Sequence, residues 1–266
     1  MVKKGQPKKK KRLKLRVNVV LKLLLFIGIV SALITYSLNL RIKNIYIVGN
    51  NTTKDVEIIE MAGIKDYPLV KNLKVKKIKN NINSLPLITN TKISINPFGK
   101  ITIKVEETNI LFFYKYNNKY ITASNESIED KNYYGYPTLI NFTPDTIFDK
   151  LVIGLTKVDY DIIRMINEIE YTPYKSSEGN IIDDELFTLK MNDGNTVMID
   201  IVNIKNLNKY ETIYASLGMD QNKGIVYLDT IIDERLLFTS YDTIKEETEI
   251  NEEEKENKEE QTEQQV

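Results

Sequence analysis

The sequence contains no cysteine, no histidine and no tryptophan. Without cysteine, the chain can form no disulfide, no thiolate nucleophile and no zinc–thiolate site. Without histidine, it has no Ser–His–Asp triad, no imidazole general base and no histidine-ligated metal. Catalysis would have to rely on carboxylates, lysine, tyrosine, serine or threonine. These absences point away from most catalytic and metal-dependent functions.

Acidic residues are absent from the first 54 positions, so the charges are unevenly distributed. The 266 residues contain 37 Lys and Arg and 37 Asp and Glu, which gives a formal net charge of zero. Residues 1–16 contain nine Lys and Arg and no acid, whereas residues 245–266 contain ten Glu against three Lys. The stretch between them, 17–244, has a net charge of −2. The acidic end lacks apolar periodicity, so we predict that residues 242–266 form a disordered tail.

One long apolar run follows the basic end. Residues 23–40 contain no charge, and eleven of these eighteen are Leu, Ile, Val or Phe. As a helix this run would be about 27 Å long, close to the ~30 Å hydrocarbon core of a bilayer. Positive charge before the run exceeds that after it, which places the N-terminus in the cytoplasm. We predict a cytoplasmic tail at 1–22, a single-pass type II transmembrane helix at 23–40 and an extracytoplasmic remainder.

Other interpretations of this end are weaker. A cleaved signal peptide has a shorter apolar region of about 7–15 residues and a small-x-small cleavage site, and neither fits here. A buried core helix directly after a polybasic tail is unusual. The basic tail could bind nucleic acid or anionic lipid, but a lysine run beside a membrane helix is typical of a topology signal. We therefore predict a membrane protein that binds no nucleic acid.

Residues 41–107 show the pattern of an α+β domain with the order β-α-α-β-β. Alternating β-branched residues predict the strands, and apolar residues at helical spacing predict the helices. One face of such a sheet can bury both helices. The predicted elements are strand 42–48, a helix from an N-cap at Thr53 to Gly63, helix 73–85, and strands 92–96 and 100–106 around the turn 97–99.

Residues 108–241 change to a β-rich pattern with flanking helices. Asn117-Asn118 and Asn192-Asp193-Gly194 each lie between apolar alternating runs, which predicts two hairpins. The predicted helices are 159–170 and 204–217, and the predicted last strands are 225–228 and 236–241.

Three short motifs, in this order and at this distance from the apolar run, carry a resemblance to a known family. They are the strand end at Ile45–Asn50 (I-x-V-x-G-N, with a shifted core), Leu85–Ile88 (L-P-x-I) and Ile103–Glu107 (I-x-V-x-E). The chain from Leu23 to Tyr241 resembles the FtsQ/DivIB family of bacterial cell-division proteins. One departure is visible, because Thr108-Asn109-Ile110 stands where many members have a basic residue and a proline.

The resemblance implies a POTRA domain at 41–107 and a β domain at 108–241. It implies a non-catalytic, bitopic scaffold of the divisome in the cell membrane at the division septum, without cofactor, metal or small-molecule substrate. The implied partners are FtsB/DivIC-like and FtsL-like membrane proteins, bound by β-strand pairing at an open sheet edge. The matching residues are Ile225, Val226, Tyr227, Leu228, Leu236, Leu237, Phe238, Thr239, Ser240 and Tyr241.

Two alternatives belong to other functional classes. A membrane-tethered cell-wall hydrolase would need two carboxylates about 5–10 Å apart across a cleft. The acidic runs Glu106-Glu107, Asp183-Asp184-Glu185 and Asp233-Glu234 do not supply such a pair alone, because adjacent strand residues face opposite sides. A POTRA-type chaperone for secreted chains would also bind by strand pairing, but would not be confined to a division site.

Overall fold

A computed structural model describes residues 17–129, 133–232 and 235–246 of the chain. The chain divides into two compact units, Met1–Glu107 and Thr108–Val266. Each unit has its own hydrophobic core, so the two are described separately.

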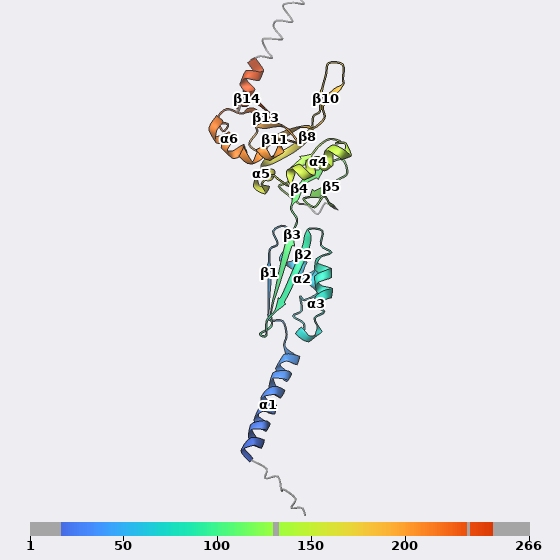
Figure 1. Cartoon of the computed structure of the whole chain (residues 1–266), viewed down its shortest axis with the longest axis vertical. Helices are drawn as coiled ribbons and strands as arrows, with labels where there is room; N and C mark the ends of the chain where they lie inside the picture. Colours follow the sequence, from blue (N-terminus) through green and yellow to red (C-terminus); the bar gives the residue numbers. More distant parts are fainter. Residues whose placement is uncertain (1–16, 130–132, 233–234, 247–266) are drawn as a thin grey trace, which may run out of the picture. The chain divides into compact units, whose positions relative to one another are not determined.

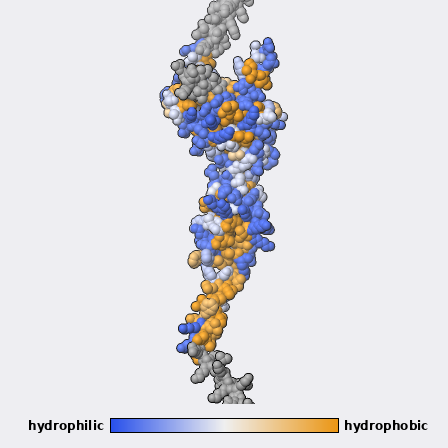
Figure 2. Space-filling view, in the orientation of Figure 1, coloured by the Kyte–Doolittle hydropathy of each residue, from blue (hydrophilic) through white to orange (hydrophobic). Residues whose placement is uncertain are grey.

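The first unit begins with the helix α1 (Val17–Asn39), whose 23 residues include no buried side chain. At about 1.5 Å per residue, the helix is long enough to cross the hydrocarbon core of a bilayer. Figure 2 shows its largely apolar surface. It is the one helix of the described chain with the length and composition of a membrane span. It starts earlier than the predicted run 23–40 and therefore includes Lys22, whose long stem can carry its charge toward the headgroups.

Polar side chains near the end of α1 are bonded within the helix. Thr35 Oγ1 donates to the carbonyl of Ser31 at 2.9 Å, and Asn39 Nδ2 donates to the carbonyl of Thr35 at 3.0 Å. Such bonds lower the cost of polar groups in an apolar environment.

After α1, the first unit has the predicted order β-α-α-β-β (Figure 1). Its three-stranded sheet has the order β1-β3-β2, with β1 parallel to β3 and β2 antiparallel to β3. Two helices bury their apolar residues against one face of this sheet, with a short 3₁₀ turn between them. The elements are β1 (Asn44–Val48), α2 (Asp55–Ala62), η1 (Val70–Asn72), α3 (Val75–Ile82), β2 (Ile88–Ile95) and β3 (Lys100–Glu107).

The helix ends of the first unit differ in part from the prediction. Gly63 ends α2 in the left-handed region at φ 66°, as predicted. The N-cap is Lys54 and makes no side-chain cap bond, so the predicted cap at Thr53 is wrong. The Glu107 carboxylate takes over part of this role. It accepts hydrogen bonds from the main-chain N–H groups of residues 51, 52 and 53 at 2.7, 2.8 and 2.9 Å.

The second unit is built on a nine-stranded sheet with the order β14-β13-β12-β11-β8-β7-β4-β5-β6 (Figure 1). Two further short strands form a separate hairpin. The strands are β4 (Ile110–Tyr114), β5 (Lys119–Thr122), β6 (Ser127–Glu129), β7 (Thr138–Leu139), β8 (Ile166–Tyr171), β9 (Tyr174–Lys175), β10 (Ile181–Asp183), β11 (Leu186–Met191), β12 (Thr196–Asp200), β13 (Gly224–Ile232) and β14 (Arg235–Ser240). The helices are α4 (Asp145–Leu155), α5 (Tyr160–Met165), η2 (Ile204–Lys209) and α6 (Tyr210–Leu217).

One row of cross-strand neighbours crosses the sheet on its core face. It connects β4 to β14 by strand register, and its members pack in one core with apolar residues of the helices. The row consists of Tyr114, Leu139, Ile169, Leu189, Val197, Val226 and Phe238. This row decides which face of the last strand is core, because Phe238 faces the helices and its neighbours in β14 face away.

Three predictions for the second unit need correction. The helix predicted at 159–170 ends at Met165, and β8 begins at Ile166. A register irregularity opposite β11 brings Ile166 and Ile169 to the core face although they are three residues apart. A β-bulge therefore imitated helical spacing. The first six residues of the helix predicted at 204–217 form the 3₁₀ helix η2. Residues 241–246 are helical, so the predicted disordered tail at 242–266 begins too early; residues 247–266 lie outside the described part.

Candidate partner-binding edge

The predicted binding residues fall on two adjacent strands that differ in their neighbours. β13 pairs with β12 on one side and with β14 on the other. β14 pairs with β13 and with no other strand of the described chain. Since only an edge strand exposes a row of unpaired main-chain groups, strand addition is restricted to β14. Within β13, Ile225, Val226 and Tyr227 have partners in both neighbouring strands, so their main chain is not available to a partner.

The free main-chain groups of β14 belong to alternate residues. The N–H of Tyr241, just after the strand, donates to the carbonyl of the residue before β13 at 3.0 Å. In an antiparallel ladder this orientation repeats at every second residue, so Leu237 and Thr239 also point toward β13. Phe238 and Ser240 therefore direct their N–H and C=O groups toward the free side. The edge offers a short, alternating set of donors and acceptors.

The outer face of the sheet next to this edge is apolar. Leu237 is 54% exposed, and its cross-strand neighbour Tyr227 lies beside Met198 of β12. Ile225 is half-buried on the same face, opposite Thr239. An added strand would extend this apolar surface, so both backbone bonds and side-chain contacts are available to a partner.

The other predicted residues do not reach this surface. Val226 and Leu228 are buried in the core, with 0% and 1% exposure. Tyr241 lies beyond β14, where its hydroxyl shares a 2.6 Å hydrogen bond with Thr196 Oγ1. Leu236 belongs to β14 by its main chain, and its side chain lies outside the described residues.

Close packing at Gly224 holds β14 in place. A Cβ atom at this position would lie 2.2 Å from the carbonyl oxygen of Thr239 and 2.9 Å from the ring of Phe238. Only glycine allows β14 to approach β13 this closely. The sequence marks this position only as the start of a strand, so its role was not predicted.

A buried polar network fixes the start of β13 behind this glycine. The N–H of Gly224 donates to Asn195 Oδ1 at 3.0 Å, and Asn195 is 1% exposed. Asp193 Oδ1 accepts from the main-chain N–H and the amide of Asn195, and Asp193 Oδ2 accepts from the Tyr210 hydroxyl at 2.8 Å. Burial, and then the bond to Asp193, raise the pKa of Tyr210 well above its usual range. The turn residues 192–194 thus have a second task that their hairpin signal did not reveal.

The carboxylates weighed for a hydrolase have other roles. Glu107 binds three main-chain N–H groups, and Asp183 Oδ1 accepts from the N–H of Glu185 at 2.9 Å. Glu185 in turn forms an ion pair with Lys150. The pair at 233–234 lies outside the described residues. In the described part of the chain, no group of three or more His, Cys, Asp or Glu side chains is placed to hold a metal ion.

Comparisons with known proteins agree on one family. Residues 40–108 match the model of the POTRA domain, FtsQ-type. The cell division protein DivIB of Listeria monocytogenes is 25% identical over 219 residues, covering 78% of each chain. DivIB of Staphylococcus aureus is 26% identical over 188 residues, or 68% of this chain and 41% of that longer protein.

One solved structure is also similar. It is the major extracytoplasmic domain of the bacterial cell division protein DivIB from Geobacillus stearothermophilus, with a TM-score of 0.32 at 17% identity. The overlap covers 43% of this chain and 98% of that one.

Proposed function

Because this chain is a member of the FtsQ/DivIB family of bacterial cell-division proteins, we propose that it is a non-catalytic scaffold of the divisome. In this proposal α1 anchors the chain in the cell membrane with the N-terminus in the cytoplasm, since residues 1–16 carry nine Lys and Arg. The two folded units then lie outside the cytoplasm at the division septum. The expected partners are bitopic proteins of the FtsB/DivIC and FtsL types.

One observation carries the proposed mechanism. β14 has a free main-chain edge, and an apolar strip lies directly beside it on the outer face of the sheet. We define this outer strip as Met198, Ile225, Tyr227 and Leu237. A partner segment in extended conformation gains affinity from main-chain bonds to Phe238 and Ser240, and specificity from side chains placed on the outer strip.

The mechanism can be tested at Ser240, whose N–H points to the free side. Ser240→Pro removes this donor without interrupting the bonds between β14 and β13. The loss of one main-chain bond and the steric effect of the ring should reduce affinity for the partner ectodomain by about tenfold or more. Isothermal titration calorimetry with the purified chain in detergent measures the change.

Ser240→Ala is the matched control. It keeps the main-chain N–H and removes only the hydroxyl, which donates to Asn222 Oδ1 at 2.6 Å. This variant should bind like the wild type. Unchanged affinity of a folded Ser240→Pro variant would exclude pairing at this edge.

The cellular role is tested separately with a fluorescent fusion in dividing cells. The proposal predicts a band at the septum that appears before constriction ends. A uniform membrane signal through the whole division cycle would contradict a divisome role.

A further inference from the structure

The first unit carries a lysine cluster without acidic partners. Five lysines fall within nine residues, and no Asp or Glu occurs between Asp66 and Glu106. Among the described residues, none of the five lies within 4.0 Å of a carboxylate oxygen. Four are exposed and Lys79 is half-buried. The cluster consists of Lys71, Lys74, Lys76, Lys77 and Lys79.

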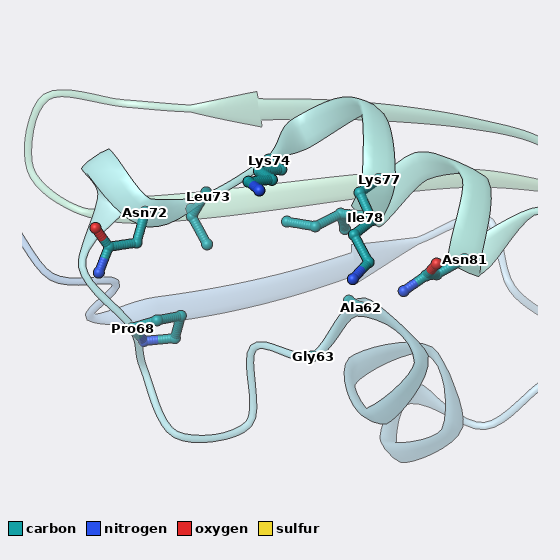
Figure 3. Close-up of a pocket in the computed structure, with 9 residues that line it drawn as sticks. All are labelled: Ala62, Gly63, Pro68, Asn72, Leu73, Lys74, Lys77, Ile78 and Asn81. Atoms are coloured by element: carbon teal, nitrogen blue, oxygen red, sulfur yellow. The ribbon is translucent and has the colours of Figure 1, made fainter.

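A groove of about 350 Å³ lies beside this cluster, between the end of α2, η1 and the start of α3. Figure 3 shows Lys77 and Asn81 extending from α3 toward the end of α2, with Asn72 and Leu73 on the opposite side. Leu73 and Ile78 contribute apolar surface, and Lys74 and Lys77 contribute positive charge. The groove thus combines apolar and cationic walls, which suits an amphipathic anion.

The start of α3 adds to the positive potential. Its N-cap, Lys74, makes no side-chain cap bond, and its first turn has no acidic residue. The first N–H groups of a helix lack internal partners and attract anions. Here the neighbouring charges are ammonium groups, so nothing in the described surroundings neutralises this helix end.

Main-chain bonds bring one wall of the groove to the end of α1. The N–H of Val70 donates to the carbonyl of Leu40 at 2.8 Å, and the N–H of Ile42 donates to the carbonyl of Pro68 at 3.1 Å. Leu40 directly follows α1, which ends at Asn39. Since three residues span at most about 10 Å, Pro68 lies close to the point where α1 leaves the bilayer.

We propose that this groove binds anionic phospholipid headgroups of the leaflet in which α1 ends. The ammonium groups of Lys74 and Lys77 and the start of α3 bind the phosphate, and Leu73 and Ile78 contact the glycerol and first acyl carbons. The inference rests on the proposed role of α1 as a membrane anchor. It adds a lipid-dependent orientation of the first unit, because a bound headgroup would hold the domain against the membrane.

The test uses the full chain in lipid nanodiscs. The chain has no cysteine, so Val75→Cys, at an exposed position of α3, can carry a single fluorophore. Quenching by headgroup-spin-labelled lipid is compared in phosphatidylcholine and in phosphatidylcholine with phosphatidylglycerol. Strong quenching is expected only with phosphatidylglycerol. Equal quenching in both lipids would overturn the proposal.

Matched double variants separate the groove from total charge. Lys74→Ala/Lys77→Ala should weaken the phosphatidylglycerol-dependent quenching about 30-fold in midpoint concentration, at about one tenfold step or slightly less per lysine. Lys92→Ala/Lys104→Ala removes the same charge from the exposed face of the hairpin β2–β3 and should leave the midpoint within about twofold. If both pairs have the same effect, general electrostatics accounts for the result and the groove assignment is wrong.

Two further arms identify the source of the anion and guard against misinterpretation. Inorganic phosphate at millimolar concentration should not reduce the quenching, and full displacement by it would overturn the lipid assignment. Failure of the wild-type chain to enter nanodiscs would contradict the membrane anchor itself, and with it the proposed function. A normal anchor without lipid-dependent quenching would contradict only the groove. Circular dichroism of each variant confirms that the domain is folded.

Discussion

The two folded parts of this chain have opposite formal charges. Residues 41–107 contain 12 Lys and Arg against 6 Asp and Glu, a net charge of +6, whereas residues 108–244 contain 12 against 21, a net charge of −9. The basic part is the one that directly follows α1. Charge of this sign next to a membrane favours contact with anionic headgroups, while the acidic part is repelled by them and favours basic partners. The total of zero therefore conceals two surfaces suited to different contacts.

The two sheets differ in the same sense. The exposed face of the small sheet carries Lys92, Lys100 and Lys104 on β2 and β3, and lysines on exposed strands discourage pairing with other chains. The last strands of the large sheet carry Ile225, Tyr227 and Leu237 on the corresponding outer face. One sheet is protected against strand addition, and the other is open to it at β14.

The largest effect is expected at Gly224. Gly224→Ala would force the new Cβ within 2.2 Å of the Thr239 carbonyl oxygen, so β14 must leave β13 and expose Phe238. We expect the second unit to lose about 3 kcal/mol of unfolding free energy, and partner binding to fall below detection. Urea denaturation followed by tyrosine fluorescence measures the stability.

Gly179→Ala is the control for this substitution. Gly179 has φ +85°, and no atom lies within 4 Å of the place that a Cβ would occupy, so only local strain of about 1 kcal/mol is expected. If Gly224→Ala costs no more than this control, β14 is not held by the close approach. A change in the first unit's unfolding would show that the two units do not unfold independently.

A smaller effect is expected in the basic unit at Glu107. Glu107→Ala removes a carboxylate that accepts three main-chain hydrogen bonds of 2.7 to 2.9 Å. Charge-assisted bonds of this kind suggest a loss of about 2 kcal/mol. Glu106→Ala, which removes only an exposed contact with Lys92 at 3.8 Å, should cost less than about 0.5 kcal/mol. Similar losses in both variants, measured by thermal unfolding, would contradict the role given to Glu107.

The smallest effect is expected at Tyr210, and it depends on pH. Tyr210→Phe removes the bond to Asp193 and should cost about 1 kcal/mol at pH 8. Burial raises the pKa of Tyr210 in the folded state, so the wild type loses stability as the pH rises above about 10, where the unfolded tyrosine ionises. Phenylalanine does not ionise, so the difference between the two proteins should shrink from pH 8 to pH 11. A difference that stays constant over this range would contradict the buried, neutral hydroxyl; Tyr214→Phe serves as the control.

The sequence predicted the order of elements better than their limits. Local signals sufficed where side chains alternate or a glycine ends a helix, as at Gly63 and in the turn 97–99. They failed at β8, because a bulge gave Ile166 and Ile169 the spacing of a helix. The helix α4 was not predicted, although five of its residues are buried.

The candidate site was predicted only in part, for a physical reason. Alternation marks β13 and β14 as strands, but strand order depends on contacts between distant residues, so the sequence alone does not say which strand is the edge. The paired register of Ile225 to Tyr227 excludes β13 from strand addition. The approach of Gly224 to Thr239 and the network from Tyr210 to Asn195 likewise join residues far apart in the chain, and no local motif announces them.

Amide hydrogen exchange along β14, measured by NMR with and without a partner ectodomain of the FtsB/DivIC type, tests strand addition most directly. In the free protein, the N–H groups of Leu237 and Thr239 should exchange slowly and those of Phe238 and Ser240 quickly. On binding, Phe238 and Ser240 should become protected by at least about tenfold, while Leu237 and Thr239 change little. A bound partner that leaves Phe238 and Ser240 exchanging at their free rates would contradict the central claim that it pairs with the edge of β14.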